Sequence, residues 1–345
     1  MRTSKRNKGK SRSIKHWSAM LATTSLVVGT LAGCGASPTT SSATPTASSS
    51  GPKTIEFIPT SNSTPYFLDE YAGIQKEAAK FGYKTELQAP SVSANINTEI
   101  NLVREAVASK VNGIILVPYS PTALVAPAEA AEKAGIPVIA TDSSVNAGAK
   151  TFTAVNDVKG AEAIAKYAAQ FVNGKGEYAI IDYNLSTTSG IDRRNGFQSE
   201  MKKYPGMKFA GLQISNSVVQ TALQETTTLL EQNPKINVIF GANDRSALGV
   251  AEAVSRLGLQ NKVCVVGFDA DLGEINFIKS GVIKASALQS PVLMGETAVL
   301  ALRQVWAGKT LPKYEELPFH IVTYKNYNTP TSVAAIRQYL LNYQS

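Results

Sequence analysis

The side chains best suited to chemistry in this 345-residue chain are polar groups that follow short apolar runs. They are Asn62 and Thr64 after the run 54–58, Asp142 after 137–140, Arg193 beyond 178–181, Asn243 after 238–240, Asp269 after 263–267 and Gln289 after 284–288. Carboxylates accept hydrogen bonds, amides both donate and accept, and arginine donates in a planar fork. This set suits a small ligand that carries several hydroxyl groups.

Aromatic residues stand beside this polar set. Tyr66 and Phe67 follow the first apolar run and are placed to cover the C–H face of a sugar ring. Tyr119 and Ser143 are further candidates for the same site. For Asp142 or Asn243 taken singly, a helix N-cap is an equally good interpretation, because Asp and Asn are common at strand ends in that role.

Histidine and cysteine are too scarce for most catalytic sites. Beyond residue 34 the chain has one histidine, His320, which leaves almost no material for imidazole triads or multi-histidine metal sites. We therefore expect no enzyme, no metal and no cofactor. A hydrolase that uses Asp142 and Asp269 as a carboxylate pair is the remaining catalytic alternative.

The elements that must position these residues alternate between strand and helix patterns. Strands are expected at 54–58, 84–87, 113–117, 137–140 and 152–155, and then at 178–181, 208–214, 238–240, 263–267 and 284–288. Helices are expected near 66–81, 95–110, 124–134, 160–172, 191–203, 219–231, 245–257 and 272–280, and a last one near 332–343. Glycines at 82, 135, 258 and 281 stand where a helix C-terminus needs a left-handed residue.

This alternation predicts the α/β class, with two doubly wound, Rossmann-like lobes of parallel sheet joined by a hinge. Residues 53–157 with about 290–319 are expected to form the N-terminal lobe, and 158–289 with about 320–345 the C-terminal lobe. In such sheets ligands bind outside the carboxyl ends of the strands. The polar residues above lie at those ends, so we expect them to meet between the lobes.

The first 33 residues have the layout of a lipoprotein signal peptide. A basic start without acidic residues precedes an apolar stretch at 17–32, which is too short and too often interrupted for a membrane-spanning helix. The stretch ends in Leu31-Ala32-Gly33-Cys34, so we expect cleavage before Cys34 and lipidation of its thiol. Residues 34–52, rich in Ser, Thr and Pro, are expected to be a disordered tether.

Removal of the leader also changes the charge. Seven of the 34 basic residues and none of the 26 acidic ones precede Cys34, so the remaining chain carries 27 − 26 = +1. A basic nucleic-acid footprint is therefore absent, and no nucleic-acid partner is expected. Cys264, in an apolar run without a disulfide partner, is expected to be a core residue.

Several segments together resemble the ribose-type periplasmic binding proteins, the type I substrate-binding components of ABC importers. The resemblance covers nearly all of residues 53–327. It is carried by Pro65-Tyr66-Phe67, by the segment 135–139 leading to Asp142, by Arg193-Arg194-Asn195-Gly196-Phe197, by Asn243-Asp244, by 265–269 and by Gln289-Ser290-Pro291.

The resemblance implies a role for each candidate. Tyr66 and Phe67 would stack on the ligand, Asp142 and Asp269 would accept from its hydroxyls, and Arg193, Asn243 and Gln289 would complete the polar shell. Arg193, rather than Arg194, holds the motif position four before Phe197, and we expect Arg194 on a solvated helix face. The family also implies an ABC permease as partner and an exported, monomeric receptor held by lipid to the outer face of the cell membrane.

Two departures from the ribose pattern concern the pocket. Ser143 stands where an arginine commonly follows the aspartate, and Asn216-Ser217 lacks the aromatic residue expected in the second lobe. Both argue against copying ribose as ligand, and they leave other pentoses, hexoses, polyols or a furanone-type signal open. A repressor built on the same fold would need a helix-turn-helix before residue 53, where this chain has a leader and a tether.

Overall fold

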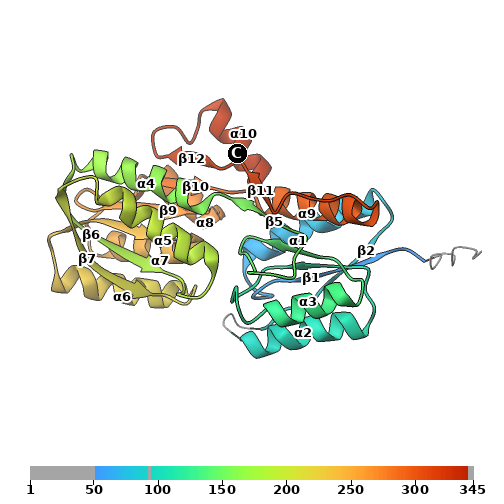
Figure 1. Ribbon diagram of the computed structural model, residues 1–345. Helices are drawn as coiled ribbons and strands as arrows, with labels where there is room; N and C mark the ends of the chain where they lie inside the picture. The colour runs from blue at the N-terminus through green and yellow to red at the C-terminus, as the bar shows by residue number, and fades with distance from the viewer. Residues whose placement is uncertain (1–50, 92–94, 270, 341–345) are drawn as a thin grey trace, which may run out of the picture. The chain divides into compact units, whose positions relative to one another are not determined.

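Short, mostly apolar runs form the central strands of the first of two six-stranded sheets in the computed structural model, which describes residues 51–91, 95–269 and 271–340. The first sheet has the order β11-β5-β4-β3-β1-β2 and is parallel throughout (Figure 1). Its strands are β1 (Thr54–Ile58), β2 (Lys84–Leu87), β3 (Gly113–Leu116), β4 (Val138–Thr141), β5 (Thr151–Val155) and β11 (Tyr314–Leu317).

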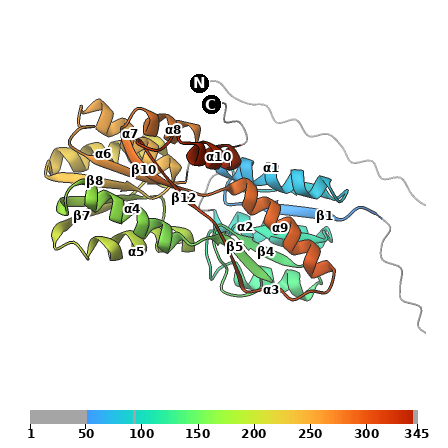
Figure 2. The same ribbon diagram turned by 90° about the horizontal axis from the view of Figure 1, so that it is seen from above.

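Helices cover both faces of this sheet, because the side chains of each strand alternate between the two faces. Ile115 belongs to the core beneath α1 (Pro65–Ala79) and α9 (Pro291–Trp306), whereas its neighbour Ile114 belongs to the core beneath α2 (Ile96–Ala108) and α3 (Val125–Lys133). Helices α1 and α9 run side by side, although more than 200 residues separate them in the sequence (Figure 2).

The second sheet has the order β12-β10-β9-β8-β6-β7. Its strands are β6 (Lys175–Asp182), β7 (Gly206–Ile214), β8 (Ile236–Gly241), β9 (Cys264–Phe268), β10 (Ile283–Leu288) and β12 (His320–Thr323). Its helices are α4 (Asp157–Phe171), α5 (Thr188–Met201), α6 (Val219–Gln232), α7 (Asp244–Arg256), α8 (Leu272–Lys279) and α10 (Pro330–Tyr339). The core on one side of the sheet includes α4 and α5, and the core on the other includes α6, α7 and α8.

The edge strand β12 departs from the expected all-parallel arrangement, because it pairs with β10 in the antiparallel sense. Only two residues separate the end of β11 from the start of β12, so the extended chain passes directly from one sheet to the other. It enters the second sheet opposite Leu288, the last residue of β10, and must then run backwards along that strand. Both sheets are therefore dominated by parallel strands as expected, but one edge strand runs in the opposite direction.

The chain also changes sheets between β5 and α4 and between β10 and α9. The lobe boundaries expected near residues 157, 290 and 319 remain a proposal. Most local expectations hold: Gly82, Gly135, Gly258 and Gly281 all have a positive φ after a helix, and Cys264 is fully buried.

Two sequence-based expectations, the leader with Cys34 and the tether up to residue 50, lie outside the described residues. Within the described part of the chain, no helix has both the length and the apolar character needed to cross a bilayer.

Candidate functional site

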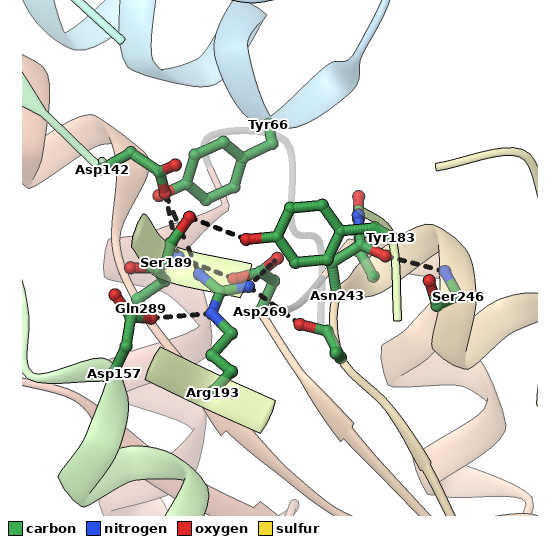
Figure 3. Close-up of polar contacts among 12 residues, drawn as sticks. Tyr66, Asp142, Asp157, Tyr183, Ser189, Arg193, Asn243, Ser246, Asp269 and Gln289 are labelled. Atoms are coloured by element: carbon green, nitrogen blue, oxygen red, sulfur yellow. Dashed lines mark hydrogen bonds and ion pairs between the residues drawn. The ribbon is translucent and has the colours of Figure 1, made fainter. Parts of the chain in front are cut away.

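The carboxyl ends of both sheets converge on one cavity of about 190 Å³. This is below the roughly 300 to 1,000 Å³ of pockets that hold drug-sized ligands, so the cavity suits a single small ring. Its lining comes from both sheets and their following loops: Thr60, Thr64, Tyr66, Phe67, Val117, Tyr119, Asp142, Tyr183, Asn184, Thr187, Arg193, Asn216, Ser217, Asn243, Asp244 and Asp269. Figure 3 shows the polar contacts among these residues and their neighbours.

The first lobe contributes the aromatic wall. Pro65 begins α1, so the next two residues, Tyr66 and Phe67, stand on its first turn, where their rings meet edge to face with centroids 5.4 Å apart. The Tyr66 hydroxyl is buried beside Met294 Sδ, 3.9 Å away. Burial and then the charges of Asp142 and Asp269 raise the pKa of Tyr66, so the phenol stays protonated and can donate.

A buried glutamate holds the loop that carries Tyr119. The backbone N–H of Tyr119 donates to both carboxylate oxygens of Glu99, at 3.2 Å each. Burial raises the pKa of Glu99 to about 8. Glu99 therefore positions a lining residue from beneath the cavity.

Arg193 is the centre of the polar wall. It projects from α5, is only 2% exposed, and its guanidinium carbon lies 4.0 Å from the centroid of the Phe268 ring. Its Nε donates to Asp157 at 2.7 Å, and one terminal nitrogen, Nη1, donates to Asp269 at 3.1 Å and to the Ala242 carbonyl at 3.0 Å. Burial alone lowers the pKa of Arg193, but these carboxylates outweigh that effect and raise it, so the side chain remains a cation.

Asp142 and Asp269 come from different lobes and are joined through Gln289. The Gln289 amide donates to Asp269 at 2.7 Å and, more weakly, to Asp142 at 3.5 Å. Both aspartates have a positive φ, 58° for Asp142 and 76° for Asp269. Side chains other than glycine rarely adopt that conformation, and it concentrates at functional sites. Burial, partly offset by Arg193, raises the pKa of Asp142.

Asn243 serves as cap and as pocket wall at the same time. Its side-chain oxygen accepts from Ser246 N at the start of α7, and its amide donates to Ser217 Oγ at 3.1 Å. The two interpretations left open for this residue are therefore compatible. Asp142 caps no helix, because the next helix in the described chain begins at Asp157.

The remaining candidates occupy mixed positions. Thr64 and Tyr119 line the cavity, and Gln289 lies directly behind it. Asn62 is exposed and does not line it. Ser143 is buried and is not among the lining residues, and its Oγ lies 2.8 Å from Ser189 Oγ.

The expectation that Arg194 lies on a solvated face is wrong. Arg194 Nη1 lies 2.5 Å from an oxygen of the fully buried Asp182, and its side chain is only 15% exposed. The other oxygen of Asp182 accepts from Tyr183 N. Arg194 therefore holds the carboxyl end of β6 through Asp182. The spacing of residues along a helix does not reveal such a partner.

Asn216 and Ser217 line the cavity without an aromatic ring, as the sequence indicated, but an aromatic residue of the second lobe reaches the cavity from another loop. Tyr183, directly after β6, lines the cavity, and its hydroxyl lies 2.7 Å from Ser189 Oγ. Asn184 and Thr187 follow in the same loop. The strand-end rule would have found them if the strand had been extended from Ile181 to Asp182. Asp157, the buried partner of Arg193, comes two residues after the predicted strand 152–155, so the same rule would have found it as well.

A family model described as a periplasmic binding protein domain matches residues 55–310 of the chain. The chain belongs to the periplasmic binding proteins. The D-allose-binding periplasmic protein of Escherichia coli is 29% identical to it over 274 residues, which are 75% of this chain and 87% of that protein. A D-apiose import binding protein of Actinobacillus succinogenes is 30% identical over 270 residues, 76% of this chain and 85% of the relative.

The fold of this periplasmic binding protein is also found in solved structures of related proteins. A carbohydrate transporter solute-binding protein from Agrobacterium radiobacter, in complex with D-arabinose, has a TM-score of 0.80 and 29% identity. The match covers 84% of this chain and all of that one. The type I two-lobe fold is thus confirmed. The relatives are binding and import proteins rather than enzymes, so the family is one of exported receptors.

Proposed function

We propose that this protein is an extracytoplasmic substrate-binding lipoprotein of an ABC transporter, which captures a sugar or related polyol between its lobes and delivers it to a permease. The observation that carries the proposal is the cavity itself. The aromatic rings of Tyr66 and Phe67 lie on one side of the cavity, and the charged, hydrogen-bonded network around Arg193 lies on the other. The space between them suits a single sugar ring. The similar proteins are named for D-allose and D-apiose, and a similar structure holds D-arabinose.

In this proposal each group has a defined task. Tyr66 and Phe67 cover the apolar face of the ring, and Asp142 and Asp269 accept from hydroxyls. Arg193 and Asn243 donate to ring or hydroxyl oxygens, while Gln289 aligns the two carboxylates. Tyr183 extends the aromatic wall from the second lobe.

Lipid anchoring at Cys34 and handover to a permease are part of the same proposal. Two observations support the anchor: periplasmic binding proteins are exported, and the sequence Leu-Ala-Gly-Cys stands at 31–34. In cells fed a labelled fatty acid, the protein should take up the label and Cys34→Ser should not. Equal labelling of both proteins would refute the anchor.

The direct test of function is a thermal-shift screen of the intact protein against pentoses, hexoses, polyols and a furanone signal. A ligand at 100 times its Kd adds about 2.7 kcal/mol of stability, which gives a measurable shift. We expect a neutral monosaccharide or polyol to stabilise the protein, and Asp269→Ala to abolish the shift. Glu231→Ala, an exposed carboxylate on α6, is the matched control and should keep it. Stabilisation by the furanone alone would reject the carbohydrate assignment.

A further inference from the structure

The cavity is acidic. Its lining contains the carboxylates of Asp142, Asp244 and Asp269 against one cationic side chain, Arg193. Asp157 adds a fourth carboxylate directly behind Arg193, at 2.7 Å. Arg245, which follows Asp244, is not part of the lining, and its Nε donates to the Ser217 carbonyl. Negative groups therefore outnumber positive ones at the place where a ligand would bind.

Arg193, the one cation in the cavity lining, has few N–H groups left to bind an anionic ligand. Two of the three guanidinium nitrogens of Arg193 are already hydrogen-bonded to Asp157, Asp269 and the Ala242 carbonyl. Its third nitrogen, Nη2, faces Asp142 at 3.9 Å. An incoming carboxylate or phosphate would thus meet the cation only alongside a resident carboxylate.

Among the carboxylates of the cavity, Asp142 has acceptor positions that are still available for hydrogen bonds to a ligand. Its contacts with Gln289, Ser143 and Arg193 are all 3.5 Å or longer, and the Tyr66 hydroxyl is a further hydrogen-bond partner, so its acceptor positions are only partly used. The residue that follows it, Ser143, is uncharged, and its hydroxyl lies 3.5 Å from Asp142 Oδ2. The same hydroxyl bonds to Ser189 at 2.8 Å, which in turn bonds to Tyr183 at 2.7 Å.

The carboxylates also oppose one another's ionisation, as expected for a site with surplus negative charge. Burial, together with Asp142 and Asp269, raises the pKa of Asp157 to about 7 even though Arg193 lies beside it. Burial and the neighbouring Asp269 and Asp271 raise the pKa of Asp244 to about 8. A further negative charge in this cavity would increase the same repulsion.

We propose that the cavity is a charge filter that admits neutral and amine-bearing sugars or polyols and excludes sugar acids and sugar phosphates. The inference rests on the proposed function and refines its ligand class. The surplus of carboxylates around Arg193 and an uncharged residue, Ser143, directly after Asp142 set the filter. Like charges brought together in a desolvated site strongly oppose binding, whereas a ligand that brings only donors or a positive charge satisfies Asp142.

The test is calorimetric binding to the intact protein at pH 7.5 and 0.15 M salt. One probe set shares the galacto configuration: D-fucose is neutral, D-galactosamine carries an amine and D-galacturonate carries a carboxylate. A second pair is D-ribose and D-ribose 5-phosphate. We expect each anionic probe to bind at least about 100-fold more weakly than its neutral counterpart, and D-galactosamine to bind within about 10-fold of D-fucose.

Variants that change one charge distinguish electrostatic exclusion of the anionic probes from exclusion because their shape does not fit. Asp142→Asn removes one negative charge at nearly constant shape, and it should narrow the neutral-to-anionic affinity ratio by about 10-fold whatever it does to neutral binding. Glu231→Gln changes the net charge equally at an exposed site and should leave the ratio unchanged.

The outcomes are distinct. An anionic probe that binds within 10-fold of its neutral counterpart overturns the filter while leaving the proposed function intact. A neutral-to-anionic affinity ratio that does not change in Asp142→Asn overturns the electrostatic origin of the filter. If neither sugar, amine nor acid binds, the proposed function fails and the inference fails with it.

Discussion

At the scale of single residues, Arg193 holds the polar half of the cavity together. One guanidinium connects Asp157 on α4, Asp269 after β9 and the backbone after β8, and it packs over Phe268. A buried ion pair of this kind gains little net stability, but losing one partner leaves uncompensated charge in the interior. The cost of removing Arg193 should therefore be large and should depend on pH.

Arg193→Met should lower the free energy of unfolding by about 3–5 kcal/mol at pH 8. Asp157 already has a folded-state pKa of about 7, well above its ordinary value, and loss of Arg193 removes an interaction that holds it down. A carboxylate whose pKa is raised by folding stabilises the protein below its unfolded pKa, and that stability is lost as pH rises through the folded pKa. The deficit should thus be smaller at pH 5 than at pH 8.

Urea denaturation of both proteins at the two pH values measures this difference. Arg303→Met is the control, because Arg303 is exposed and packs only on Phe81 among the described contacts. It should cost at most about 1 kcal/mol at either pH. A deficit for Arg193→Met that does not change with pH would contradict the carboxylate network.

At the scale of elements, the contact of α1 with α9 fixes the aromatic wall. The two helices touch through glycines: a Cβ on Gly73 would lie 2.2 Å from the Val292 carbonyl oxygen, and one on Gly295 would lie 2.2 Å from the Glu70 carbonyl oxygen. Tyr66 and Phe67 stand on the first turn of α1, two turns before Gly73. The close approach of the backbones therefore determines where the rings lie.

Gly73→Ala should destabilise the protein by about 1–3 kcal/mol through overpacking, even though alanine is the better helix former by about 1 kcal/mol. It should also weaken ligand binding, since α1 must shift away from α9 and carry the rings with it. Thermal unfolding and calorimetric titration measure the two effects.

Gly211→Ala provides the comparison. A Cβ at Gly211, on the edge strand β7, would meet only Leu229 Cδ2 at 3.5 Å, an ordinary contact. This substitution should leave both stability and binding nearly unchanged. Equal behaviour of the two variants would show that the helix contact is not tight.

At the scale of the whole molecule, the described residues include direct bonds between the two lobes. Ser143 bonds to Ser189, and Ser144 N donates to Thr188 Oγ1 at 2.8 Å. The proposed ligand set is likewise divided, with Tyr66 and Asp142 on one side and Arg193, Asn243 and Asp269 on the other. Only a closed arrangement satisfies all of these contacts, so ligand should stabilise it by differential affinity.

Small-angle scattering should show a smaller radius of gyration when the sugar found in the screen is added at saturating concentration. Asp269→Ala, which cannot hold the ligand from the second lobe, should show no change under the same conditions. An unchanged radius for the parent protein at saturation would refute ligand-driven closure.

The sequence by itself determined the α/β class, nearly every helix and strand, and the strand ends where polar side chains gather. These features are local: periodicity, glycine at helix ends and residue type after an apolar run are all readable along the chain. Seven principal candidates, Tyr66, Phe67, Asp142, Arg193, Asn243, Asp269 and Gln289, lie at or directly behind one cavity.

The tertiary structure alone decided what each side chain meets. Ser143 bonds to Ser189 in the other lobe, Arg194 pairs with Asp182, Tyr183 supplies the missing aromatic wall, and β12 runs antiparallel to β10. Each of these depends on atoms that lie far away in the sequence or across the two lobes. Periodicity specifies which face of an element is buried, but the partner on that face is set by packing between elements.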